Sequence, residues 1–98
     1  MSMDTPQVRH VADDHKGAFV IEHDGTRLAE MTYSLAGEIA IIDHTEVDPS
    51  LRGTGAGAKL VAAAVAWARE GRHRIMPLCP FAKSVFDKTP EYADVLAR

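Results

Sequence analysis

Residues 48–68 read DPSLRGTGAGAKLVAAAVAWA and place three of the chain's seven glycines within five positions, directly before an alanine-rich run. Glycine inside a helix costs about 1 kcal/mol relative to alanine, so Gly53, Gly55 and Gly57 need a physical reason. The first N–H groups of a helix lack internal partners, and glycine lets an anion approach that backbone closely. The stretch therefore predicts either an anion-binding loop that opens a helix or a turn followed by close packing.

The residues before this loop have the pattern of an antiparallel β-meander. Asp24-Gly25 is a strong hairpin signal, and residues 36–38 (AGE) predict a second turn. Residues 39–42 (IAII) are apolar on both faces, which predicts a central strand. The expected strands are residues 8–12, 17–23, 26–35 and 38–47.

The residues after the loop predict a helix, a fifth strand and further helices. Residues 55–70 should form the long helix, with a C-cap at Gly71. The later elements are expected at residues 74–79 (strand), 80–88 (helix) and 90–98 (short helix). The apolar stripe of the long helix comprises Leu60, Val61, Ala64, Val65 and Trp67 or Ala68, and Val85 and Phe86 are core candidates. The fold class is thus α+β in a single domain, 1–98, with residues 1–6 expected to be disordered.

Composition excludes several classes of protein. No run approaches the roughly 18 apolar residues that a membrane span needs, and the N-terminus has no signal-peptide pattern. The single cysteine, Cys79, excludes an internal disulfide and favours a cytoplasmic location. Residues 1–49 contain three Lys/Arg and ten Asp/Glu, and residues 50–98 contain eight and four. The basic half holds the glycine loop and suits an anionic ligand there, whereas nothing indicates binding to nucleic acid.

The glycine loop does not fit the common nucleotide-binding motifs. A Walker A loop requires Gly-Lys followed by Ser or Thr, but Lys59 stands between Ala58 and Leu60. A dinucleotide fingerprint requires an early βαβ unit and an acidic residue about 20 positions later, and neither is present. The five histidines show no close pair of metal ligands, so no metal is predicted.

The motif Arg52-x-x-Gly55-x-Gly57, within VDPSLRGTGAG (residues 47–57), resembles the acyl-CoA-binding loop of the GNAT superfamily of N-acetyltransferases. The resemblance covers roughly residues 7–95. It implies that the loop amides bind the pyrophosphate of coenzyme A, and that the pantetheine arm lies between strands 38–47 and 74–79. On this resemblance the residues that bind acetyl-CoA are Val47, Arg52, Gly53, Thr54, Gly55, Ala56, Gly57 and Lys83.

The same resemblance implies direct attack of an amine on the thioester, which needs a base and an acid. Glu46 is the first candidate for the base and His44 the second, and each is alternatively a structural residue at a strand end. Family members often carry a tyrosine acid on the helix after the fifth strand, where this chain has Phe86. Cys79 is the candidate that replaces it, as acid or as covalent nucleophile. Its alternative is a small buried core residue.

The interval between the first two strands leaves no room for the two helices that full-length family members have there. The acceptor site is therefore expected to be open, shallow or completed by another molecule. This fits a large acceptor such as a protein amine, a homodimer, or a protein that mainly binds the cofactor, while the acceptor itself is left open between a small-molecule amine and a protein amine. Besides a structural domain without a cofactor, in which the glycine loop would serve packing alone, two functions remain open from the sequence. The first is acetyl-CoA-dependent N-acetyl transfer to a primary amine, and the alternative is a non-catalytic coenzyme A or acyl-CoA binding module.

Overall fold

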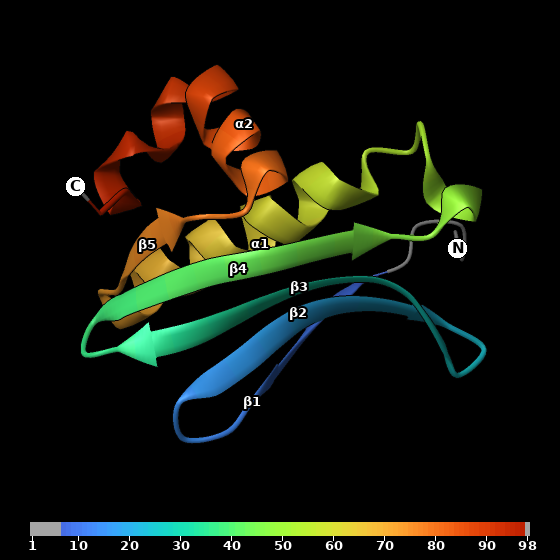
Figure 1. Cartoon of the computed structure of the whole chain (residues 1–98), viewed down its shortest axis with the longest axis horizontal. Coiled ribbons are helices and arrows are strands. Elements are labelled where there is room, and N and C mark those ends of the chain that lie inside the picture. Colours follow the sequence, from blue (N-terminus) through green and yellow to red (C-terminus); the bar gives the residue numbers. More distant parts are fainter. Residues whose placement is uncertain (1–6, 98) are drawn as a thin grey trace.

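The computed structural model describes residues 7–97 and contains a five-stranded sheet whose strands follow the order of the chain (Figure 1). The expected disorder of residues 1–6 lies outside the described residues. The strands are β1 (Val8–Ala12), β2 (Lys16–His23), β3 (Thr26–Ala36), β4 (Ile39–Val47) and β5 (Arg74–Pro77). The helices are α1 (Ala56–Gly71) and α2 (Pro80–Lys88), with 3-10 turns η1 (Pro49–Leu51) and η2 (Pro90–Val95).

The predicted α+β architecture is confirmed. Strands β1 to β4 form the antiparallel meander, and β5 pairs in parallel with β4 after the α1 crossover. Three residues, 13–15, join β1 to β2, so the expected absence of helices at this point is confirmed. The position of β4 between β3 and β5 explains why residues 39–42 are apolar on both faces.

Both α-helices contribute to one core on one face of the sheet. The predicted stripe of α1 is confirmed, since Leu60, Val61, Ala64, Val65 and Ala68 are at most 1% exposed. Trp67 is partly buried against the same core. Along β3, Ala29, Met31 and Tyr33 face the helices and are buried, while the alternate residues point to the other face. Over the described residues, no helix is both long and apolar enough to cross a membrane.

Three predicted details of the elements differ in the structure, and the first has a local cause. The left-handed residue that ends α1 is Arg72 (φ 60°), not Gly71. Gly71 instead leaves room for His73, because a β-carbon at Gly71 would lie 2.8 Å from that ring. The last helical segment is the 3-10 turn η2 rather than an α-helix, and β5 ends at Pro77 rather than at Cys79.

The ring of Tyr33 covers Gly17, its direct partner across β2 and β3. The Tyr33 hydroxyl lies 2.6 Å from Nε2 of His10, and burial raises the pKa of Tyr33 while it lowers the pKa of His10. A β-carbon at Gly17 would overlap the tyrosine ring. The glycine therefore allows the ring to lie flat over the strand and reach the histidine.

We expect Gly17→Val to displace this ring and to destabilise the protein by about 2–3 kcal/mol, because overpacking forces side chains out of their rotamers. Urea unfolding followed by circular dichroism measures the change. Tyr33→Phe keeps the ring and removes only the contact with His10, so it should cost about 1 kcal/mol. An unchanged urea midpoint for Gly17→Val would contradict this account of the Gly17–Tyr33 pair.

Candidate active site

The two parallel strands pair along only part of their length. Ile39 to Ile42 of β4 lie beside Arg74 to Pro77 of β5, and the N–H groups of Leu78 and Cys79 both donate to the Ile42 carbonyl. Beyond that point β4 continues to Val47 without a strand beside it on this edge. Residues 43–47 therefore offer unpaired backbone groups on the side where β5 has ended, as the resemblance implied for the pantetheine arm.

A β-bulge at Asp43 decides which side chains of β4 face the helices. The register runs regularly from Ala36↔Ile39 to Tyr33↔Ile42 and then shifts, so that Thr32 opposes His44. A one-residue shift exchanges the two faces of a strand. Thr45 therefore turns toward the helices, while His44 and Glu46 are exposed on the opposite, open face.

Cys79 follows the last residue of β5 by two positions and is the N-cap residue of α2. It is 6% exposed, and its S–H donates to Oγ1 of Thr45 at 3.2 Å. The thiol thus contacts, from the helix side, the part of β4 that β5 does not pair with (residues 43–47). Burial also fits the alternative that Cys79 is a small core residue. Thr45 is a neighbour that the sequence alone did not single out, because its face depends on the bulge.

The loop after β4 supplies left-handed glycines and free N–H groups. Gly53 and Gly55 have φ of 81° and 80°, a conformation that glycine adopts without strain. The N–H groups of Arg52 and Thr54 are already bonded inside the turn, to the carbonyls of Pro49 and Leu51. Among the described residues, five N–H groups of the loop and first helical turn have no acceptor, those of Gly53, Gly55, Ala56, Gly57 and Ala58.

These free N–H groups change the set of amides that the predicted anion cradle can use. They belong to positions 53 and 55–58, whereas Thr54 helps to form the turn, its hydroxyl also donating to the Leu51 carbonyl. Ala58 was not predicted, but its place in the first turn of α1 is the signal that could have found it. The side chain of Arg52 is exposed next to the cradle.

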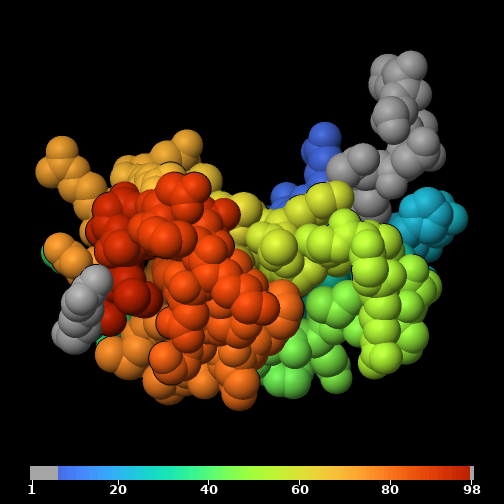
Figure 2. All heavy atoms as spheres, turned by 90° about the horizontal axis from the view of Figure 1, so that it is seen from above, coloured from blue at the N-terminus to red at the C-terminus, as the bar shows by residue number. Residues whose placement is uncertain are grey.

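Gly57 has a packing role in addition to its predicted place in the cradle. It is buried, and a β-carbon there would overlap the ring of Phe81 at the start of α2. Space-filling atoms of the loop and α1 lie next to those of α2 in Figure 2. Phe81 and Leu78, which flank Cys79, are 41% and 62% exposed. These two apolar side chains offer a surface for an apolar part of a ligand beside the thiol.

Lys83 lies on α2, four residues after Cys79, and its side chain is 65% exposed. Its Nζ is 3.7 Å from Oδ2 of Asp87 on the same helix. Phe86 is buried and packs edge-on against Tyr92 with the ring centroids 5.8 Å apart. Tyr33 belongs to the aromatic cluster with His10 and Trp67 instead. No tyrosine thus stands at the Phe86 position, and Tyr92 lies against that side chain.

Acidic groups gather on the open face. One atom each of Glu30, His44 and Glu46 lies within 4.8 Å of the other two, a spacing that ligands of one cation have. Oε1 of Glu46 is 3.8 Å from Nε2 of His44. A hollow of about 410 Å³ opens beside them, lined by Arg27, Leu28, Glu30, Glu46, Val47 and Asp48 among others. The absence of a metal stays a prediction from the sequence.

The comparisons with known proteins agree with this geometry. A family model for the GCN5-related N-acetyl-transferases matches residues 18–95. A solution structure of a GCN5-like N-acetyltransferase from Staphylococcus aureus is 35% identical, with 97% of this chain and 91% of that chain covered and a TM-score of 0.73. The comparison with the curated proteins finds no significant match.

More distant structures share the fold. The ribosomal-protein-S18-alanine N-acetyltransferase of Escherichia coli has a TM-score of 0.66 at 13% identity, with 79% of this chain and 53% of that one covered. A streptothricin acetyltransferase structure from Bacillus anthracis, in complex with acetyl coenzyme A, has a TM-score of 0.57 at 23% identity, with 69% and 40% covered.

The parted strands, the glycine loop and these matches define an enzyme of the acetyltransferase class. The chain belongs to the GCN5-related N-acetyltransferase family.

Proposed function

We propose that this chain transfers an acetyl group from acetyl-CoA to a primary amine. The observation that supports the proposal most directly is the cradle of free N–H groups at positions 53 and 55–58, placed where β4 has parted from β5. The cradle would hold the pyrophosphate of the cofactor, with Arg52 and Lys83 adding positive charge. The pantetheine arm would run from Val47, next to the cradle, along the unpaired edge of β4 toward Asp43.

The thioester would then lie at the unpaired edge of β4, where groups from the open face and from the helix side can both reach it. An amine arrives from the open face, where Glu46 accepts its proton and the nitrogen attacks the thioester carbonyl. When the carbon–sulfur bond breaks, the Cys79 S–H protonates the departing thiolate from the helix side, and the nitrogen loses its second proton to water. Glu46 then releases its proton to water, and the cysteine regains one from water. Proton transfers of this kind contribute about 10²–10⁴ each. The reaction needs no metal, because the thioester is already activated.

A cytoplasmic location fits this chemistry, since Cys79 must remain a reduced thiol. The alternative function is a non-catalytic coenzyme A or acyl-CoA binding module. The observation that favours it is the buried Phe86, which cannot donate a proton at the position of the family's tyrosine.

Two measurements test the proposal together. Calorimetry measures coenzyme A binding, and thiol release from acetyl-CoA measures transfer to a panel of primary amines. We expect both, and we expect Arg52→Ala to weaken coenzyme A binding about tenfold, because a charge-assisted contact with phosphate is lost.

Arg72→Ala removes the same charge at the other end of α1 and is the matched control, which should bind normally. Binding without transfer to any amine would favour the binding module. No binding at all would contradict both functions.

A further inference from the structure

The two edges of the sheet differ in how their backbone is covered. Strand β5 ends at Pro77, and Leu96 lies beside Ile75, whose carbonyl accepts from the N–H of Ala97. Strand β1 forms the opposite edge (Figure 1), and it has no proline, no lysine and no bulge in its register with β2. Proteins block exposed edges with such features, because a free edge pairs with another strand. The edge at β1 is therefore open to pairing.

Alternate residues of β1 direct their backbone groups to this free edge. The N–H of Asp13 donates to the Lys16 carbonyl, so these two residues are a hydrogen-bonded pair of the β1–β2 hairpin. Hydrogen-bonded and non-hydrogen-bonded pairs alternate along an antiparallel ladder. The pairs that Val8, His10 and Ala12 make with β2 are thus non-hydrogen-bonded, and their N–H and carbonyl groups point away from β2.

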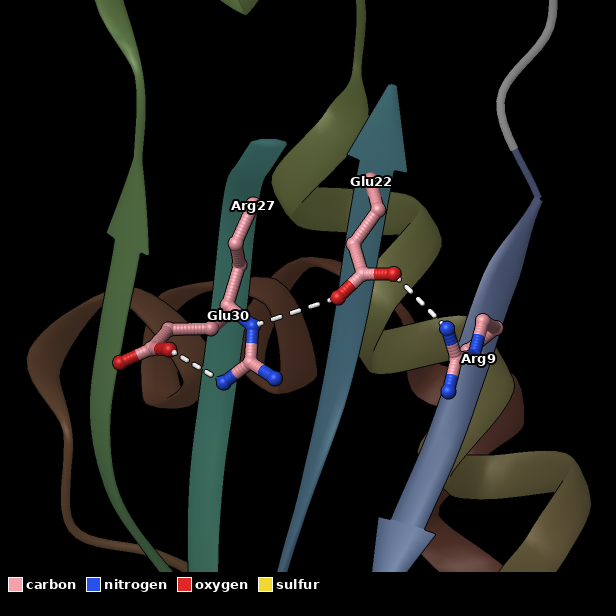
Figure 3. A network of polar contacts seen from close by, with 4 residues as sticks. All are labelled: Arg9, Glu22, Arg27 and Glu30. Atoms are coloured by element: carbon pink, nitrogen blue, oxygen red, sulfur yellow. Dashed lines mark hydrogen bonds and ion pairs between the residues drawn. The ribbon is translucent and has the colours of Figure 1, made fainter. Parts of the chain in front are cut away.

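Three side chains at this edge, Arg9, Val11 and Asp13, lie on the open side of the sheet. Val11 is 41% exposed, and a hollow of about 480 Å³ lies beside Val11 and Asp13. Figure 3 shows Arg9 on the same side, where one terminal nitrogen contacts Glu22 at 2.8 Å. Within residues 7–97, its other N–H groups and Oδ2 of Asp13 make no hydrogen bond or ion pair. An exposed apolar residue thus stands between a cation and an anion that can each bind a further partner.

We propose that β1 pairs with β1 of a second copy of this chain, antiparallel about a two-fold axis through Val11. Val11 then meets the partner's Val11 as a non-hydrogen-bonded pair, the kind in which side chains come closest. Arg9 lies opposite the partner's Asp13, and the symmetry repeats this ion pair on the other side of the axis. His10 exchanges backbone hydrogen bonds with the partner's Ala12. The pairing does not depend on acetyl transfer, since none of these residues belongs to that site.

The side chains favour this register over its neighbours. An axis through Arg9 would bring two guanidinium groups together, and an axis through His10 would set Arg9 against the apolar Val11. Like charges directly opposite each other destabilise a sheet, whereas opposite charges and matched apolar residues stabilise it. One short segment supplies both partners of every contact about Val11. A second copy is therefore a better fit to this edge than an unrelated extended peptide.

Sedimentation velocity of the full chain, from about 10 µM to about 1 mM, tests the proposal. The paired segment is short, so the interface is of the weak class and we expect a Kd of roughly 100 µM at low salt. The Kd should rise near 1 M salt, because exposed ion pairs are screened. Val11→Lys sets two like charges at the axis and should weaken the dimer about tenfold or more. Leu78→Lys, the same change at an exposed apolar residue beyond β5, is the matched control and should dimerise normally.

Two charge reversals test the register. Arg9→Glu and Asp13→Arg should each be monomeric alone, because each sets like charges opposite one another. An equimolar mixture of the two variants should form a heterodimer, since every charge then meets its opposite. Circular dichroism of each variant checks that it has folded.

A monomer at every concentration would overturn the proposal, and so would a dimer that Val11→Lys leaves unchanged. Two folded charge-reversal variants that stay apart when mixed would also contradict it, because the register about Val11 requires them to associate.

Discussion

Cys79→Ala should lower kcat for acetyl transfer by about 100-fold and leave coenzyme A affinity within about twofold. The thiol is buried at the N-cap of α2 and donates to Thr45, in the part of β4 that β5 does not pair with, so it is placed to protonate the departing thiolate. Loss of a positioned acid costs about 10²–10⁴ in rate. The cradle at positions 53 and 55–58 is untouched by the substitution, because no N–H group in it bonds to Cys79.

Steady-state kinetics and calorimetry measure the two quantities. Thr45→Val keeps the volume near the thiol and removes only its hydroxyl acceptor, so its rate should fall by less than about tenfold. Intact-protein mass spectrometry after incubation with acetyl-CoA distinguishes the two roles of the cysteine. An adduct with the mass of one acetyl group, lost in Cys79→Ala, would replace the direct route with a covalent one. Full activity of Cys79→Ala would contradict a catalytic role and favour the alternative that Cys79 is a small core residue.

Glu46→Gln should lower kcat/KM about 100-fold at neutral pH, because nothing then accepts the proton of the incoming ammonium. The loss should shrink as the pH approaches the pKa of the amine, about 10.4 for a lysine side chain. At that pH, neutral amine is already abundant in solution. A merely structural role for Glu46 would show no such recovery, and the pH profile is therefore the decisive measurement.

His44→Gln is the matched comparison for the base. His44 lies on the same face and 3.8 Å from Glu46, and it is the second candidate. We expect its loss to cost less than about tenfold at neutral pH. The opposite order of effects, with His44→Gln the more severe, would transfer the role of base to the histidine.

Local patterns in the sequence determined the elements of the fold. The Asp24-Gly25 turn has positive φ at both residues, and β1, β3 and α2 lie within one residue of their expected bounds. These predictions succeed because hydrophobic periodicity and turn chemistry act over a few residues. The glycine turn that opens α1 could also be predicted, since Gly53 and Gly55 stand directly before its apolar stripe. Anion binding by this turn stays a prediction. The sequence could not show which N–H groups of this turn are free, because that depends on the hydrogen bonds that Arg52 and Thr54 make within it.

The arrangement of the chemical groups depended on tertiary structure. Counted from the turn between β3 and β4, the regular register would have set Thr45 opposite Glu30 and turned Glu46 toward the helices. The bulge at Asp43 reverses this, so that Glu46 opposes Glu30 on the open face and Thr45 meets Cys79 on the other. The sequence by itself indicated which residues are candidates for the acid and the base. Only the fold decided on which side of β4 each candidate lies, because one extra residue in a strand exchanges its faces and no local pattern records the exchange.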